Sequence, residues 1–88
     1  MIEYSLYINF APNTNLFEFM ETINRIKVVL AEKRKTGKWL AESLGKDKST
    51  VSKWCTNTSQ PDLQTLSKIA KLLDVDRREL LTPTKNDL

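Results

Sequence analysis

Two short helical segments joined by a three-residue turn that begins with a glycine are the feature of this sequence that most restricts its fold. Ala41 precedes Gly45 by four residues, and Val51 follows the glycine after six. A small side chain lets two helices cross closely, and glycine readily takes the left-handed backbone that can end a helix. The spacing therefore predicts a helix that ends at Leu44, a three-residue turn, and a second helix over residues 48–55 that crosses the first.

Three further helices are predicted from apolar residues at helical spacing. The first covers residues 22–34, with an apolar stripe formed by Ile23, Ile26, Val29 and Leu30. The fourth helix ends near residue 73, and its inward-facing residues are Leu63, Leu66, Ile69, Ala70 and Leu73. A short fifth helix runs through Leu81.

Several polar side chains are in position to cap these helices. Thr36 and Asp47 directly precede the two central helices, and Asp62 precedes the fourth. Ser, Thr, Asp and Asn are the residues that best accept hydrogen bonds from the free N–H groups of a first helical turn. Asp76 with Glu79 forms a capping-box pattern that opens the fifth helix.

The N-terminal segment has a different pattern. From residue 2 to residue 10 apolar and polar side chains alternate, and this period of two is typical of a β-strand. A single strand cannot satisfy its own backbone, so the arm either adds to a strand of a second copy or is a poorly ordered extension. The sequence thus predicts an N-terminal arm (1–21), an all-α domain of five helices (22–82) and a flexible tail (83–88).

The composition argues against most catalytic and metal sites. The 88 residues include one cysteine, Cys55, and no histidine. An intramolecular disulfide, the usual zinc sites and the commonest general base are therefore missing, and a redox role for Cys55 lacks a resolving cysteine. We expect no enzyme activity, no catalytic residues, no metal and no cofactor. No apolar run reaches the ~18 residues of a membrane span, and the N-terminus lacks the basic start of a signal peptide, which predicts a cytoplasmic protein.

Positive charge is concentrated in the middle of the chain. Residues 25–53 contain nine basic and three acidic residues, a formal charge of +6. The rest of the chain contains five basic and eight acidic residues, which leaves the whole at +3. Such a concentration is typical of a phosphate-binding surface, although a solvated helix surface without a partner can carry similar charges.

The outward positions of the second central helix are polar or cationic, and none is acidic. Val51 and Trp54 lie one turn apart and are expected to anchor the helix in the core. The positions left facing outward are Lys48, Ser49, Thr50, Ser52 and Lys53. These side chains can form hydrogen bonds with base edges and phosphates, so residues 36–54 predict a DNA-binding helix-turn-helix.

From about Asn24 to Leu81 the sequence resembles the Cro/lambda-repressor-like helix-turn-helix family, whose compact domain has five helices. The resemblance covers roughly two thirds of the chain. It rests on Leu40-Ala41, Gly45, Ser49-Thr50-Val51-Ser52-Lys53-Trp54, Pro61, Leu66, Ile69-Ala70-Lys71-Leu72-Leu73 and Asp76-Arg77-Arg78-Glu79-Leu80-Leu81.

The resemblance implies that the helix 48–55 enters the major groove of double-stranded DNA. The implied base contacts come from Lys48, Ser49, Thr50 and Lys53. The implied phosphate contacts come from Thr36, Lys38, Ser52, Asn57, Thr58 and Ser59. The implied function is a sequence-specific transcriptional regulator, in the first instance a repressor, that binds as a homodimer. The alternative is an antitoxin or adaptor on the same fold that binds a protein partner through the apolar arm.

Four positions depart from the family pattern. Gly37 and Cys55 stand where the family often has Gln and Glu, so a phosphate contact would pass from the Gln side chain to backbone amides or to Lys38. Asn57 replaces a usual glycine, and it is expected to take the left-handed backbone at the helix exit. Trp39 occupies a position that is normally polar. Its ring either packs against the first helix or joins the arm in an apolar patch that faces a partner.

Overall fold

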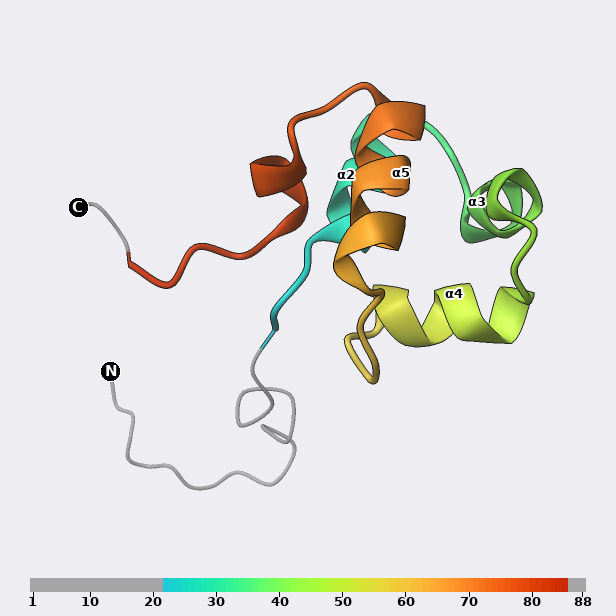
Figure 1. Cartoon of the computed structure of the whole chain (residues 1–88), viewed down its shortest axis with the longest axis horizontal. Coiled ribbons are helices and arrows are strands. Elements are labelled where there is room, and N and C mark those ends of the chain that lie inside the picture. Colours follow the sequence, from blue (N-terminus) through green and yellow to red (C-terminus); the bar gives the residue numbers. More distant parts are fainter. Residues whose placement is uncertain (1–21, 86–88) are drawn as a thin grey trace.

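The computed structural model describes residues 22–85, and this part of the chain is all-helical (Figure 1). Its elements are α2 (Ile26–Glu32), α3 (Gly37–Leu44), α4 (Lys48–Cys55), α5 (Leu63–Leu73) and the 3-10 helix η1 (Arg77–Leu80). The predicted fold class is confirmed, except that the expected fifth helix is one turn of 3-10 helix. The predicted arm (1–21) and residues 86–88 of the predicted tail lie outside the described residues. None of the helices within 22–85 is long and apolar enough to cross a membrane.

The helices α3 and α4 form the most closely packed pair in the domain. In Figure 1, α3 is seen end-on while α4 runs across the view, so the two helices cross. Ala41 is 1% exposed at the core side of α3, which agrees with its predicted role at a close crossing. Gly45 ends α3 with a φ of 67°, and the next N–H, that of Lys46, donates to the Ala41 carbonyl at 2.9 Å. The turn predicted from the spacing of these residues is therefore present.

One hydrophobic core joins all four helices and η1. The scaffold residues that the sequence singles out, Leu40, Ala41, Val51 and Trp54, all belong to it. The remaining members are Ile26, Val29, Leu30, Leu66, Ile69, Ala70, Leu73 and Leu80. Each of these twelve residues is at most 5% exposed, so α4 is held by its inner face and cannot turn without breaking the core.

The predicted caps form at some helices and not at others. The Thr36 hydroxyl and the Asp62 carboxylate each accept a hydrogen bond from the N–H three residues on, at 3.0 and 2.7 Å. Asp47 occupies the cap position of α4, but its side chain makes no capping hydrogen bond. The Asp76 carboxylate accepts from the N–H of Arg78 at 2.8 Å, one residue earlier than a capping box requires, because η1 is wound more tightly than an α-helix.

The helix predicted over residues 22–34 begins later, at Ile26. Asn24 instead pairs with Leu81 in an isolated antiparallel bridge. The N–H of Arg25 donates to the Leu80 carbonyl at 2.8 Å. These backbone groups are committed to the C-terminal segment, so they cannot join the helix. Ile23, which the sequence places on the buried stripe, is 47% exposed for the same reason.

Leu63 is a second residue that the apolar pattern misplaces. It is the first residue of α5 and is 79% exposed, although its spacing puts it in line with Leu66, which is buried. Helical periodicity gives the direction in which a side chain points, but not how far the neighbouring helices extend along that face. The core therefore covers α5 only from its second turn onward.

Candidate nucleic-acid interface

The helix α4 is anchored on one face and open on the other. Val51 and Trp54 are buried at 1% and 5% exposure. The four predicted base-contacting residues lie on the remaining positions: Lys48, Ser49 and Lys53 are exposed, and Thr50 is half-buried. Ser52, predicted to contact phosphate, is also exposed. The helix thus presents cations and hydroxyl groups to solvent from a rigid support.

A groove with a volume of about 470 Å³ runs between α2, the start of α3 and α4. Its cationic lining residues are Lys27, Lys35, Lys38 and Lys48, and no acidic residue within 22–85 lines it. Gly37 also lines the groove, and a Cβ atom there would lie 3.8 Å from Val51 Cγ1. Ser52 adds a hydroxyl group to the lining, whereas the hydroxyl of Thr56, which also lines the groove, donates to the Ser52 and Lys53 carbonyls at 3.1 and 3.3 Å. The groove has the charge and the donors that a phosphate backbone requires.

Two lysines of this groove are missing from the contacts that the sequence predicts. Lys27 comes from α2 and Lys35 from the turn before α3. Both lie in the basic segment 25–53, so the charge distribution includes them. The helix-turn-helix motif does not, because it begins only at residue 36. Lys27 lines the same groove as Lys38 and Lys48 because α2 packs against α4.

Trp39 packs against the hydrophobic core and is half-buried. The Lys35 ammonium lies 5.0 Å from the centre of its ring, within cation–π distance. Of the two predicted roles, packing against the body of the domain therefore accounts for this side chain within the described residues. The other role involves the arm, which lies outside them.

The loop after α4 carries three predicted phosphate contacts in different environments. Thr58 and Ser59 are exposed, and their N–H groups both donate to the Lys53 carbonyl, at 2.8 and 3.2 Å. Asn57 has a φ of 62°, so the predicted left-handed exit is present. Its side chain, however, is engaged within the protein. Its Oδ1 accepts from the N–H groups of Ile23 and Asn24 at 2.9 and 2.8 Å.

Cys55 lines the same groove and is half-buried. Burial raises the pKa of its thiol, and the nearby charge of Lys27 offsets this only in part. A redox sensor requires the opposite, a thiolate stabilised at neutral pH. The environment of Cys55 is therefore that of a packing residue.

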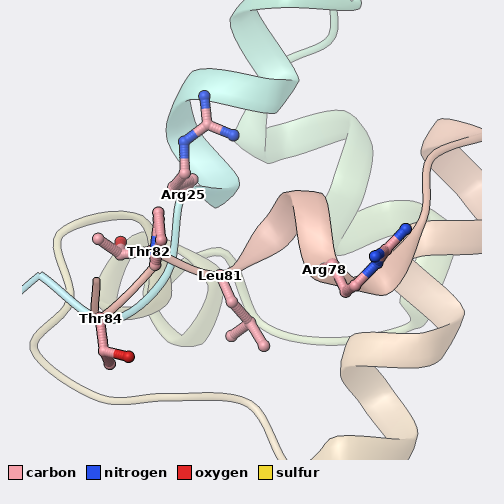
Figure 2. Close-up of a pocket in the computed structure, with 6 residues that line it drawn as sticks. Arg25, Arg78, Leu81, Thr82 and Thr84 are labelled. Atoms are coloured by element: carbon pink, nitrogen blue, oxygen red, sulfur yellow. The ribbon is translucent and has the colours of Figure 1, made fainter. Parts of the chain in front are cut away.

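A second hollow, of about 540 Å³, lies where the chain leaves η1. Figure 2 shows Leu81, Thr82 and Thr84 along this chain, with Arg25 and Arg78 to either side. The Arg25 guanidinium donates to the Glu79 carbonyl at 2.9 Å, and the Arg78 Nε lies 3.2 Å from an Asp76 carboxylate oxygen. Because both cations have partners within the protein, this hollow offers less free charge than the groove beside α4.

The fold and the exposed face of α4 define a class of protein, the helix-turn-helix domains. The chain belongs to the helix-turn-helix family, whose model matches residues 29–80, and within it to the Cro/lambda-repressor type that the sequence resembles. The matching family model thus confirms the family that the residues of α3 and α4 indicate.

One solved structure similar to this chain is that of a candidate DNA-binding protein from Bacteroides fragilis. The two chains are 58% identical, with a TM-score of 0.68. The match covers 68% of this chain and 97% of the other. No curated protein matches the chain.

Proposed function

We propose that this protein is a sequence-specific regulator of transcription that binds double-stranded DNA by inserting α4 into the major groove. The observation that carries the proposal is the two-sided character of α4. Its inner residues are locked in the core, while its outer residues are cations and hydroxyls with no acid among them. An α-helix fits the major groove, where base edges are distinguishable. The family membership and the similar Bacteroides fragilis protein support this role.

In this proposal α4, the recognition helix, supplies the base contacts through Lys48, Ser49, Thr50 and Lys53. Lysine pairs with guanine O6 and N7, so a weak preference for guanine is expected. The phosphate contacts come from Thr36, Lys38, Ser52, Thr58 and Ser59, to which the groove adds Lys27 and Lys35. The backbone at Asn57 lies in the same loop, with its side chain turned toward Asn24.

The assembly and the regulatory effect are also proposals. A single domain of this size contacts one half-site, and tight selective binding then requires a homodimer on a two-fold symmetric operator. Occupying an operator without any catalytic site acts most directly as repression. The protein would do this in the cytoplasm as a non-enzymatic regulator.

The test is a DNA-binding titration of the full chain at several salt concentrations, on a duplex selected from a random pool. We expect wild type to bind with micromolar or tighter affinity. The logarithm of the binding constant should fall with the logarithm of the salt concentration, with a slope of roughly −0.9 per phosphate contacted. Lys48→Ala/Lys53→Ala should bind roughly 30-fold or more weakly, because each lost base contact costs about 1–3 kcal/mol.

The matched control is Lys68→Ala/Lys71→Ala, which removes the same charge from exposed positions of α5. It should reduce affinity only slightly, through the long-range field. Equal losses of affinity in the two double variants would mean that DNA binding depends on net charge and not on the residues of α4. Binding that is absent, or independent of salt, would contradict the proposed function.

A further inference from the structure

A small polar network ties the segment before α2 to the end of α4. Asn24 is a buried polar residue at 2% exposure. Its Nδ2 donates to the Trp54 carbonyl at 2.9 Å and to Gln60 Oε1 at 2.7 Å. Its Oδ1 accepts from the N–H of Ile26, also at 2.9 Å. The side chain therefore holds the end of α4, the following loop and the start of α2 at one point.

Asn57 completes the network from the other side. Its Oδ1 accepts from the backbone N–H of Asn24 at 2.8 Å, and its Nδ2 donates to the Asn24 carbonyl at 3.1 Å. Gln60 Nε2 adds a further hydrogen bond to the same Oδ1 at 3.2 Å. Asn57 also has a left-handed backbone, with φ 62°, at the point where the chain turns away from the end of α4. Asn57 thus ends the helical segment with its backbone and holds the loop against Asn24 with its side chain.

The network fixes the loop that follows α4, residues 56–60. The N–H groups of Thr58 and Ser59 donate to the Lys53 carbonyl. The side chains of Asn57 and Gln60 form hydrogen bonds with Asn24. The two hydrogen bonds that join the Asn24 side chain to the Trp54 carbonyl and to the Ile26 N–H are buried. They are costly to lose, because the freed groups stay out of reach of water.

We propose that Asn24 and Asn57 are positioning residues for DNA binding. They dock the loop 56–60 and the end of α4 on the start of α2, and so determine where Thr58 and Ser59 meet the phosphates. This inference rests on the DNA-binding function proposed above. It assigns Asn57 an effect on affinity that its side chain exerts without touching DNA.

The variant that tests it is Asn57→Gly, which retains the left-handed backbone and removes the carboxamide. We expect DNA affinity to fall about three- to tenfold, the loss that one or two hydrogen bonds would produce. The salt dependence should become shallower by about one phosphate contact. The slope of affinity against salt concentration reports the number of phosphate contacts. It is measured on protein that circular dichroism shows to be fully folded, so a shallower slope means a lost contact and not a loss of folded protein.

The matched control is Asp74→Gly, which makes the corresponding change at the end of α5. Asp74 also has a left-handed backbone, with φ 59°. Removing its negative charge can only favour DNA binding, so it cannot mimic the predicted loss. Its affinity should equal or slightly exceed that of wild type.

Gln60→Ala provides a second, milder test at an exposed position. It removes a partner of both asparagines without opening the core, so it remains informative even where Asn57→Gly folds poorly. We expect a smaller loss of affinity, and a double variant with Asn57→Gly that loses less than the sum. If wild type binds DNA while both variants keep its affinity and salt slope, the positioning role is overturned and DNA binding stands. If wild type does not bind, both proposals fail.

Discussion

The two glycines of the chain, Gly37 and Gly45, should respond to an alanine substitution with opposite changes in stability. Gly45 has a φ of 67°, and a Cβ atom there would meet nothing within 4 Å. The cost of a side chain at Gly45 is therefore one of backbone conformation alone. Gly37 is the first residue of α3, and its Cβ would make an ordinary contact with Val51.

We therefore expect Gly45→Ala to lower the free energy of unfolding by about 1–2 kcal/mol, the cost of a left-handed backbone with a side chain. Gly37→Ala should instead raise it by up to ~1 kcal/mol, because alanine favours the helix. Urea denaturation of both variants measures the difference. A loss of stability in both would mean that the start of α3 is more crowded than the structure indicates.

Cys55 gives a prediction in pH. Since burial raises the pKa of its thiol, the neutral form is favoured by folding. The stability from this group is present below the ordinary thiol pKa and is lost as pH rises through the higher folded pKa. Alkylation by iodoacetamide should accordingly reach half its maximal rate at a higher pH in the folded protein than in denaturing urea. An equal or lower midpoint in the folded protein would indicate an activated thiolate instead.

At the scale of single elements, α5 depends on its cap. The Asp62 carboxylate accepts from the Thr65 N–H at 2.7 Å, and this hydrogen bond lowers the pKa of the carboxyl group. Its stabilising effect is therefore present above the ordinary aspartate pKa and is lost as pH falls through the lowered value.

Asp62→Ala should lower the melting temperature at neutral pH by roughly 3–6 °C, because the first turn loses its acceptor. Asp62→Asn retains an acceptor and should lose less. Thermal melts at neutral pH and near pH 2 check the sign, since the difference between Asp62→Ala and wild type should shrink in acid. A difference that stays constant across this range would contradict a role for the charged carboxylate.

The elements that the sequence predicts well are those with local boundaries. The predicted bounds of α3 and α4 hold because Thr36, Gly45 and the alternation of buried and exposed positions act within one or two turns. The predicted start of α2 is wrong because the observed start depends on pairing with residues 80–82, far along the chain. The 3-10 turn η1 likewise packs against α5 and α2, and α2 lies far along the chain.

At the scale of the whole molecule, the outward face of α4 could be predicted, and the surface around it only in part. Val51 and Trp54 fix that face by spacing alone. Lys27 joins the groove through the packing of α2 on α4, which no local pattern encodes. Lys35 lies in the turn between α2 and α3, one residue before the motif. The sequence does not single out the role of Asn24, because a polar residue beside an apolar stripe gives no sign of its partners Trp54 and Gln60, which lie 30 and 36 residues away.

The central claim is that α4 lies in the major groove with its outward residues against the bases. Intermolecular nuclear Overhauser effects between the protein and a selected operator duplex test it most directly. Thymine methyl and cytosine H5 protons lie in the major groove, while adenine H2 lies in the minor groove. We predict contacts from Lys48, Ser49 and Thr50 to the major-groove protons. Contacts from these residues to adenine H2, or contacts to bases only from elements other than α4, would contradict the account.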